Sequence, residues 1–179
     1  SLHRRLEVLR APFKPMKEAA KRFGGTLNTA FIAAAADAAG RYHRELGAPV
    51  DELRSSMAIS TRTDSSGANA FSLARTMVPT GEMPIGDRIV AIQAAAAAAK
   101  EATATAALET LAAVASALPT SLITRVARQQ AQTVDFATSN VRASPVPLFM
   151  AGAEVLENYP VGPLAGVAFN VTLLSYNHS

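Results

Sequence analysis

The sequence of 179 residues contains no cysteine and only three histidines. The absence of cysteine excludes disulfide bonds, thiolate metal sites and a cysteine nucleophile, and it is compatible with a reducing compartment. No run of about 18 apolar residues lacks a charge or a break, so the sequence predicts no membrane span. The nucleophile elbow G-x-S-x-G, the Walker loop and the dinucleotide fingerprint G-x-G-x-x-G are also missing, which leaves those enzyme classes without support.

The three histidines offer neither a metal site nor a clear catalytic group. His3, His43 and His178 have no carboxylate and no second histidine at the spacing of metal ligands, so no zinc site is expected. His43 lies near the end of a predicted helix, where a cationic side chain is favourable. The other two lie near the chain ends, where order is often poor. The rules of catalysis alone therefore identify no general base or nucleophile.

The charge of the chain is small and unevenly placed. Charged residues make up 17% of the sequence, and the net charge is +3. Most of the positive excess lies in seven early residues: Arg4, Arg5, Arg10, Lys14, Lys17, Lys21 and Arg22. A solvated face is the simplest interpretation, and the functional alternatives are attraction of the phosphates of a ligand such as CoA or of an anionic membrane surface. No aromatic residues are interleaved with these charges, so no nucleic-acid partner is expected.

The pattern of apolar residues predicts a single α/β domain, of the α+β sandwich kind. Alanine-rich and amphipathic stretches predict helices over about 12–23, 27–46, 84–117 and 119–130. Apolar runs predict strands over 53–62, 70–80, 133–139, 148–158 and 166–177. Residues 4–10 are either a strand or an extended connector, and Thr26 is expected to cap the second helix. This order favours a mixed β-sheet covered by long helices.

Three segments in chain order carry more specific motifs. The first, GGTLNTAFIAAAADAAGRYH, has Asn28 before an alanine-rich helix, and the second, GANAFSLARTMVPTGE, has Asn69 before a strand. The third is SNVRASPVPLFMAGAEVLENYPVGPLAGVAFNVTLLSYN, with Ser139, Asn140 and a Tyr-Pro-x-Gly-Pro loop. Together they resemble the C-terminal half of the bacterial wax ester synthase/diacylglycerol acyltransferase family, within the chloramphenicol-acetyltransferase-like superfamily.

The resemblance departs from the family's pattern at three places, the first of which is Ala68, interposed before Asn69 in the second segment. Thr29 stands where the family has an aspartate after the asparagine, which questions any role of that acid. Arg142, Ala143 and Ser144 replace the usual Pro-Gly of the Ser-Asn-Val-Pro-Gly-Pro segment, so a loop of different shape is expected there.

The resemblance implies one half of a two-domain CoA-dependent acyltransferase fold. Residues 1–25 are then the inter-domain connector and first helix, and residues 26–179 are the C-terminal half-domain. The family's catalytic motif, His-His-x-x-x-Asp-Gly, belongs to the N-terminal half and does not occur here, so no catalytic residue is expected in this chain. In the family, the second histidine of that motif is taken to deprotonate an alcohol, whose oxygen attacks the acyl-CoA thioester directly.

The resemblance also implies the partners of the chain. They are the N-terminal half, on a separate or cleaved chain, together with acyl-CoA and either diacylglycerol or a fatty alcohol. Acyl-CoA is a substrate, so no cofactor is expected. The expected location is the cytoplasm, including the surface of a membrane or lipid droplet. The last strand runs into Asn177-His178-Ser179, which are turn-type residues without a following strand, so we expect the chain to be a piece of a longer protein or to be completed by another chain.

Six residues are candidates for binding substrate or lining a cleft: Asn28, Asn69, Ser139, Asn140, Pro145 and Pro147. Hydroxyl and amide groups at a strand end can position substrates and donate to an oxyanion, and the two prolines pre-organise the loop that follows. The simpler alternatives are that Asn28 caps a helix, that Asn69 serves a loop, and that the Ser139-Asn140 pair ends a strand.

Four apolar residues after Pro147 are either part of the core or the lining of an acyl channel: Leu148, Phe149, Met150 and Leu156. Two other functions also fit the sequence. A non-catalytic lipid-binding or interaction module is favoured by the departures at Thr29 and Arg142. An enzyme of the same fold that uses a polyketide or nonribosomal condensation substrate differs only in pocket shape and in a carrier-protein donor, which the sequence does not fix.

Overall fold

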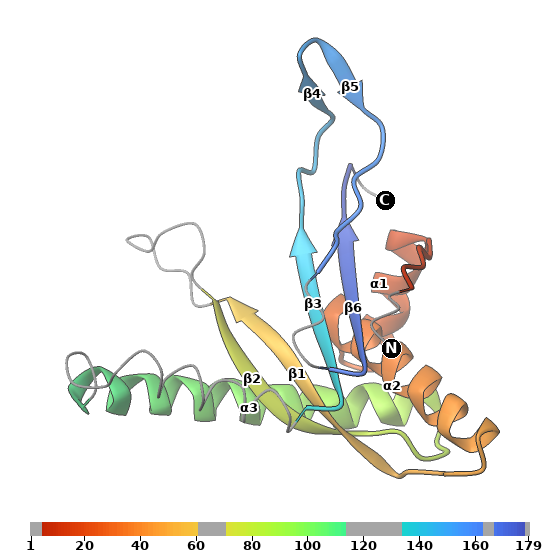
Figure 1. Cartoon of the computed structure of the whole chain (residues 1–179), viewed down its shortest axis with the longest axis vertical. Helices are drawn as coiled ribbons and strands as arrows, with labels where there is room; N and C mark the ends of the chain where they lie inside the picture. Colours follow the sequence, from red (N-terminus) through yellow and green to blue (C-terminus); the bar gives the residue numbers. More distant parts are fainter. Residues whose placement is uncertain (1–4, 61–70, 114–133, 163–166, 178–179) are drawn as a thin grey trace.

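The computed structural model describes residues 5–60, 71–113, 134–162 and 167–177 of the chain. Within these residues three helices are seen: α1 Phe13–Arg22, α2 Leu27–Glu45 and α3 Ile85–Ala113. Six strands accompany them: β1 Glu52–Ser60, β2 Phe71–Pro79, β3 Phe136–Arg142, β4 Leu148–Met150, β5 Ala153–Val155 and β6 Phe169–Ser175 (Figure 1). The predicted helix over 119–130 lies outside the described residues, and residues 5–10 form the connector rather than a strand.

The main sheet has four strands in the order β2-β1-β3-β6. β1 and β2 are antiparallel, whereas β3 lies parallel to both β1 and β6. The α/β class with a mixed sheet is therefore confirmed. β4 and β5 form a separate two-stranded hairpin that stands beyond the ends of β3 and β6 (Figure 1).

One face of the sheet packs against α2 and α3. Because paired strand residues point to the same face, β1 and β2 present four buried side chains together: Leu53, Val78, Met57 and Ala74. The helices meet them with residues spaced three or four apart: Ile32, Ala36, Ile89 and Ile92. Phe136 of β3 stacks on Phe169 of β6, with ring centroids 4.8 Å apart, and extends the core across the sheet.

The first turn of α2 shows how local sequence sets a helix start. Thr26 is the N-cap, as predicted, and its hydroxyl accepts a hydrogen bond from the Thr29 N–H at 3.2 Å. The Thr29 hydroxyl in turn accepts from the Thr26 N–H at 2.7 Å, which completes a capping box. Thr29 is buried, so the residue that departs from the family's aspartate has a structural role here.

Glycine is required where α2 passes the end of β2. A Cβ at Gly40 would collide with the backbone oxygen of Thr80, so a larger residue would push the helix off the sheet. The same region contains the fully buried side chain of Arg88.

Arg88, in the first turn of α3, joins three elements through its guanidinium. It donates hydrogen bonds to the backbone oxygens of Pro79 and, at 2.8 Å, of Gly81, and it pairs with Asp37 of α2 at 3.2 Å. Burial lowers the pKa of Arg88, and the carboxylate of Asp37 acts in the opposite direction. The end of β2, the start of α3 and the middle of α2 are therefore fixed to one charged group.

The long strand predicted over 148–158 is wrong. The chain reverses at Ala151 and Gly152, whose φ angles are 49° and 85°, and Met150 pairs with Ala153 across a two-residue loop. Two successive positive φ angles are the mark of a type I′ turn, which suits the twist of a hairpin. The sequence did not predict this turn, because Gly152 is the only turn-type residue inside the apolar run that begins at Leu148.

Within the described residues, no helix combines the length and apolar character that crossing a bilayer requires. The same part of the chain contains no group of three acidic or histidine side chains arranged to hold a metal ion.

Replacing Arg88 tests whether the buried guanidinium holds the helices to the sheet. We expect Arg88→Met to lower the free energy of unfolding by about 3 kcal/mol, because two carbonyls and Asp37 lose their buried partner. Urea unfolding followed by circular dichroism measures this change. Arg41→Met is the matched control, since Arg41 pairs with the same Asp37 at 2.8 Å but is 70% exposed, and it is expected to cost less than about 1 kcal/mol. Equal losses for the two variants would contradict the assignment.

Candidate functional site

Ser139 and Asn140 lie inside β3 rather than at its end, so the predicted strand end is wrong. The strand continues to Arg142, which pairs with Ser175 of β6, and the Ala143 N–H donates to the Ser175 oxygen at 3.0 Å. The departure from the family motif gives a physical reason. Proline is rarely found within a strand, whereas arginine readily adopts the extended backbone with which β3 continues.

The pair lies instead where the sheet divides. β1 pairs with β3 at only three positions, the last of which joins Met57 to Thr138. From Ser139 onward, among the described residues, β3 has β6 alone as its neighbour. Figure 1 shows β1 and β2 diverging from β3 and β6 beyond this point. We call this divergence of the two strand pairs the fork; Ser139 and Asn140 are the first two residues on its β3 side.

The closed end of the fork is fixed by Arg54 of β1 and Asp135, which directly precedes β3. The Arg54 guanidinium donates to both carboxylate oxygens, at 2.7 and 3.1 Å, and the Arg54 N–H donates to the same carboxylate at 2.7 Å. The Asp135 N–H donates in return to the Arg54 oxygen at 2.9 Å. These hydrogen bonds from Arg54 hold the pKa of Asp135 below its ordinary value. β1 and β3 are thus joined firmly just before they separate.

Ser139 and Asn140 point to opposite faces of the sheet, because side chains alternate along a strand. Asn140 is exposed and follows Phe136 and Thr138 on the face that packs against the helices. Ser139 is half-buried on the other face, opposite Thr172 of β6. The two side chains therefore flank the edge of β3 and do not line one common wall.

The loop after the hairpin returns over the face that carries Ser139. A Cβ at Gly162 would lie 2.5 Å from Nδ2 of Asn170 and 3.6 Å from Oγ1 of Thr172, so Gly162 of the Tyr-Pro-x-Gly-Pro motif lies directly over β6. Glycine allows this close approach. Arg10 fixes the same loop from the N-terminal connector, since it pairs with Glu157 and donates to the Tyr159 hydroxyl at 2.8 Å.

The proline loop between β3 and β4 is held by a residue that departs from the family motif. The Ser144 hydroxyl accepts from the Val146 N–H at 3.2 Å and donates to the Val146 oxygen at 2.7 Å, and the Ser144 backbone oxygen accepts from the Asn177 N–H. Pro145 and Pro147 are both exposed. They lie beside the fork in sequence, and their role in binding stays a prediction.

The remaining candidates are not brought to this place by any contact in the structure. Asn28 is half-buried in the first turn of α2, and the expectation that it caps the helix is wrong because Thr26 and Thr29 do so. No hydrogen bond among the described residues links Asn28 to β3. Asn69 lies outside the described residues.

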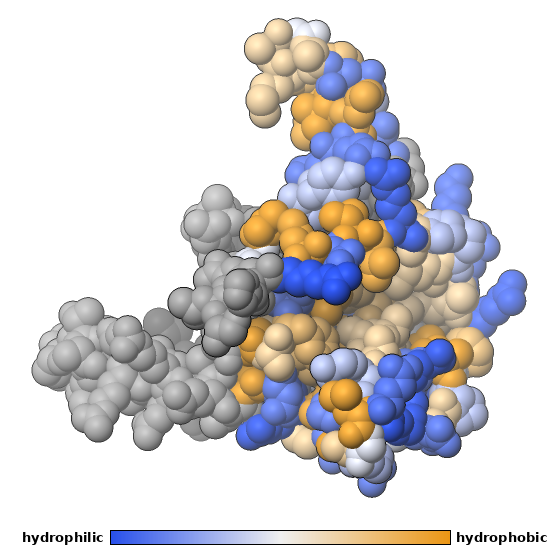
Figure 2. All heavy atoms as spheres, turned by 45° about the vertical axis from the view of Figure 1, so that its right-hand side comes forward, coloured by the Kyte–Doolittle hydropathy of each residue, from blue (hydrophilic) through white to orange (hydrophobic). Residues whose placement is uncertain are grey.

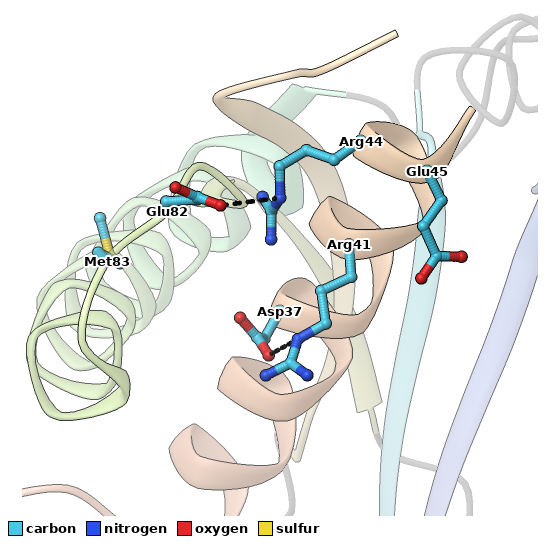
Figure 3. Close-up of a pocket in the computed structure, with 6 residues that line it drawn as sticks. All are labelled: Asp37, Arg41, Arg44, Glu45, Glu82 and Met83. Atoms are coloured by element: carbon cyan, nitrogen blue, oxygen red, sulfur yellow. Dashed lines mark ion pairs between the residues drawn. The ribbon is translucent and has the colours of Figure 1, made fainter. Parts of the chain in front are cut away.

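A charged hollow of about 400 Å³ lies elsewhere, beside the C-terminal half of α2 (Figure 3). Six residues line it: Asp37, Arg41, Arg44, Glu45, Glu82 and Met83. Its two arginines are engaged with acidic partners, Arg41 with Asp37 at 2.8 Å and Arg44 with Glu82 at 3.5 Å. Three carboxylates against two arginines give no net attraction for phosphate, and none of the predicted site residues takes part. We therefore place the candidate site at the fork.

Comparison with known proteins identifies close relatives along almost the whole chain. Residues 67–179 match the family described as the WS/DGAT C-terminal domain. Two provisionally named diacylglycerol O-acyltransferases, from two strains of Mycobacterium tuberculosis, are each 32% identical over 177 residues, which cover 98% of this chain and 36% of the relative. The chain thus spans about a third of the length of the relatives it matches.

A solved structure supports the same comparison. The wax ester synthase/diacylglycerol acyltransferase from Marinobacter aquaeolei VT8 superposes with a TM-score of 0.65 at 25% sequence identity. The superposition covers 94% of this chain and 39% of that one.

Acid titration tests the pair that closes the fork. Because the folded-state pKa of Asp135 is lowered, its carboxylate stabilises the fold above its ordinary pKa of about 3.8 and loses that effect as the pH falls through the lower folded value. We expect Asp135→Asn to be less stable than the unmodified chain at pH 7, with a difference that shrinks below about pH 4. Urea midpoints between pH 7 and pH 3 measure it. A difference that stays constant with pH would refute the ion pair as its cause.

Proposed function

The chain belongs to the wax ester synthase/diacylglycerol acyltransferase family, as its C-terminal domain, and on that premise we propose that it forms one half of an acyl-CoA-dependent O-acyltransferase. The acceptor is diacylglycerol or a fatty alcohol, and the product is a triacylglycerol or a wax ester. The observation that carries this proposal is the 32% identity, over 98% of the chain, to relatives named for diacylglycerol acylation. The boundary near residue 25 and the pairing with an N-terminal half are parts of the same proposal.

The chemistry requires a base that this chain does not provide. A histidine of the N-terminal half removes the proton of the acceptor alcohol, and the alcohol oxygen attacks the thioester carbonyl carbon. The carbon–sulfur bond then breaks, and the CoA sulfur leaves with a proton. The contribution of this chain is to position the substrates and to donate hydrogen bonds to the carbonyl oxygen as it becomes negative.

The fork supports this role because it combines polar donors with unpaired backbone. Beyond Thr138, within the described residues, the backbone groups of β3 that point away from β6 have no strand partner. An extended amide-containing ligand can bind to such an edge as an added strand does. The exposed Asn140 amide lies on the same edge and can donate to a carbonyl oxygen.

Activity measurements with both halves test the proposal. The polypeptide that includes the N-terminal half is mixed with radiolabelled acyl-CoA and either diacylglycerol or hexadecanol, and the ester is separated by thin-layer chromatography. We expect ester from the two-half protein and none from this chain alone. No ester from the two-half protein would sink the proposal, and turnover by this chain alone would refute the placement of the base.

Asn140 is the residue whose replacement should matter most in this half. In the two-half protein, Asn140→Ala is expected to lower the rate of transfer at least ten-fold, which corresponds to about 1.4 kcal/mol in the barrier. Asn158→Ala is the matched control, since Asn158 is an exposed asparagine outside the fork, and its rate is expected to be unchanged. Equal rates for the two variants, with equal thermal stability, would return Asn140 to a purely structural role.

A non-catalytic lipid-binding module is the second candidate function, and Arg142 is the observation that favours it. A charged residue replaces the motif's proline and extends β3 beside the fork. Under this alternative the two-half protein binds acyl-CoA, as measured by calorimetry, but forms no ester with any acceptor alcohol.

A further inference from the structure

The β4–β5 hairpin projects as an arm from the main sheet. We define the arm as residues 147–156; it stands beyond the ends of the main sheet (Figure 1). Its turn is the tight Ala151-Gly152 reversal, and its two strands are paired at three positions, from Leu148 with Val155 to Met150 with Ala153. A hairpin this short is not stable alone, so its position depends on what holds its base.

One buried side chain holds both strands of the arm at the base. The Tyr176 hydroxyl accepts a hydrogen bond from the Leu148 N–H at 2.8 Å and donates one to the Val155 oxygen at 2.7 Å. Tyr176 directly follows β6 and is 7% exposed. The Asn177 N–H donates to the Ser144 oxygen at 2.9 Å and fixes the entry to the arm. The arm is therefore anchored to the strand that borders β3.

The arm carries large apolar side chains that no described part of the chain covers. Leu148 is 42% exposed, Phe149 68%, Met150 73% and Leu156 78%. The expectation that they belong to the core of this chain is wrong. Figure 2 shows apolar atoms, in tan and orange, on the projecting part of the molecule. Such an exposed apolar patch on a projection marks a surface that is normally covered.

The charge of the region indicates what covers it. Between Ala143 and Gly162 the only full charges are the carboxylates of Glu154 and Glu157. A surface that binds anionic lipid combines apolar residues with lysine and arginine. The arm has the apolar residues but contains no lysine and no arginine. A protein surface is the better fit, and the relatives contain a large protein segment that this chain lacks, since the chain spans 36% of their length.

We propose that the arm docks into an apolar groove of the N-terminal half, with Phe149 and Met150 as the residues that insert. This inference rests on the proposed function for the existence of that half. Because Tyr176 ties the arm to β6, docking at the tip also fixes the fork relative to the histidine base. The arm is thus a positioning element for the reaction, some distance along the chain from Ser139 and Asn140.

Site-directed photo-cross-linking tests the proposal in the two-half protein. This half has no cysteine, and cysteines of the N-terminal half are replaced by serine, so Met150→Cys provides a single attachment point for benzophenone-maleimide. After illumination, mass spectrometry is expected to find cross-links from position 150 to peptides of the N-terminal half. Met83→Cys is the matched control, an exposed methionine away from the arm, and its yield of such cross-links is expected to be severalfold lower.

Adding Tyr176→Phe to Met150→Cys gives a second measurement. Phenylalanine keeps the ring but removes both hydrogen bonds to the arm, so the cross-link yield should fall while thermal unfolding shows a folded protein. Equal yields from positions 150 and 83 would overturn the proposal. So would cross-links mainly to a second copy of the chain, or to added phosphatidylcholine–phosphatidylglycerol vesicles. Cross-links to the N-terminal half without ester formation would refute the proposed function alone, and ester formation without these cross-links would refute the arm alone.

Discussion

The packing of α2 and α3 against the sheet depends on the buried guanidinium of Arg88. It satisfies two backbone oxygens at the end of β2 and the carboxylate of Asp37 in α2, while its own backbone begins α3. A buried charge is tolerated only when it is paired and hydrogen-bonded, so these three elements have little freedom to shift separately. The face of the sheet that the helices cover, and hence the direction of β1, follow from this arrangement.

Within the same sheet, β1 is bonded firmly to β3 beside Arg54 and Asp135 and diverges from it after Thr138. Arg54 and Asp135 join β1 to β3 through four hydrogen bonds, two of them from the guanidinium. Three residues later the strands part, and beside Ser139 and Asn140 the edge of β3 away from β6 has no strand partner among the residues that the structure describes. A binding edge of this kind needs a rigid closed end, because mobile strands would pair along their whole length or separate entirely. The candidate site is therefore a product of incomplete pairing in an otherwise regular sheet.

The sequence predicted what depends on local pattern. The cap at Thr26, the alanine-rich α2 and the alternating β1 all follow from neighbours a few residues apart. It did not predict that Ser139 and Asn140 lie within a strand, because the ladder that extends β3 is formed with β6, about thirty residues later. It also left open whether Phe149 is core or surface, since an apolar residue shows that it needs cover but not which element provides it. The roles of all six candidate site residues stay predictions: Asn28, Asn69, Ser139, Asn140, Pro145 and Pro147.

The topology of the sheet has a consequence for how the chain folds. β1 and β2 are neighbours in sequence, whereas the contact that joins β1 to β3 closes a loop of 81 residues. Long-range parallel pairing is slow because the entropy of closing the loop is lost before the contact is gained. We therefore expect the pairing of β1 with β3 to form later than the antiparallel pairing of β1 with β2. Before β1 and β3 pair, each has an exposed strand edge, and exposed strand edges favour aggregation during synthesis or refolding.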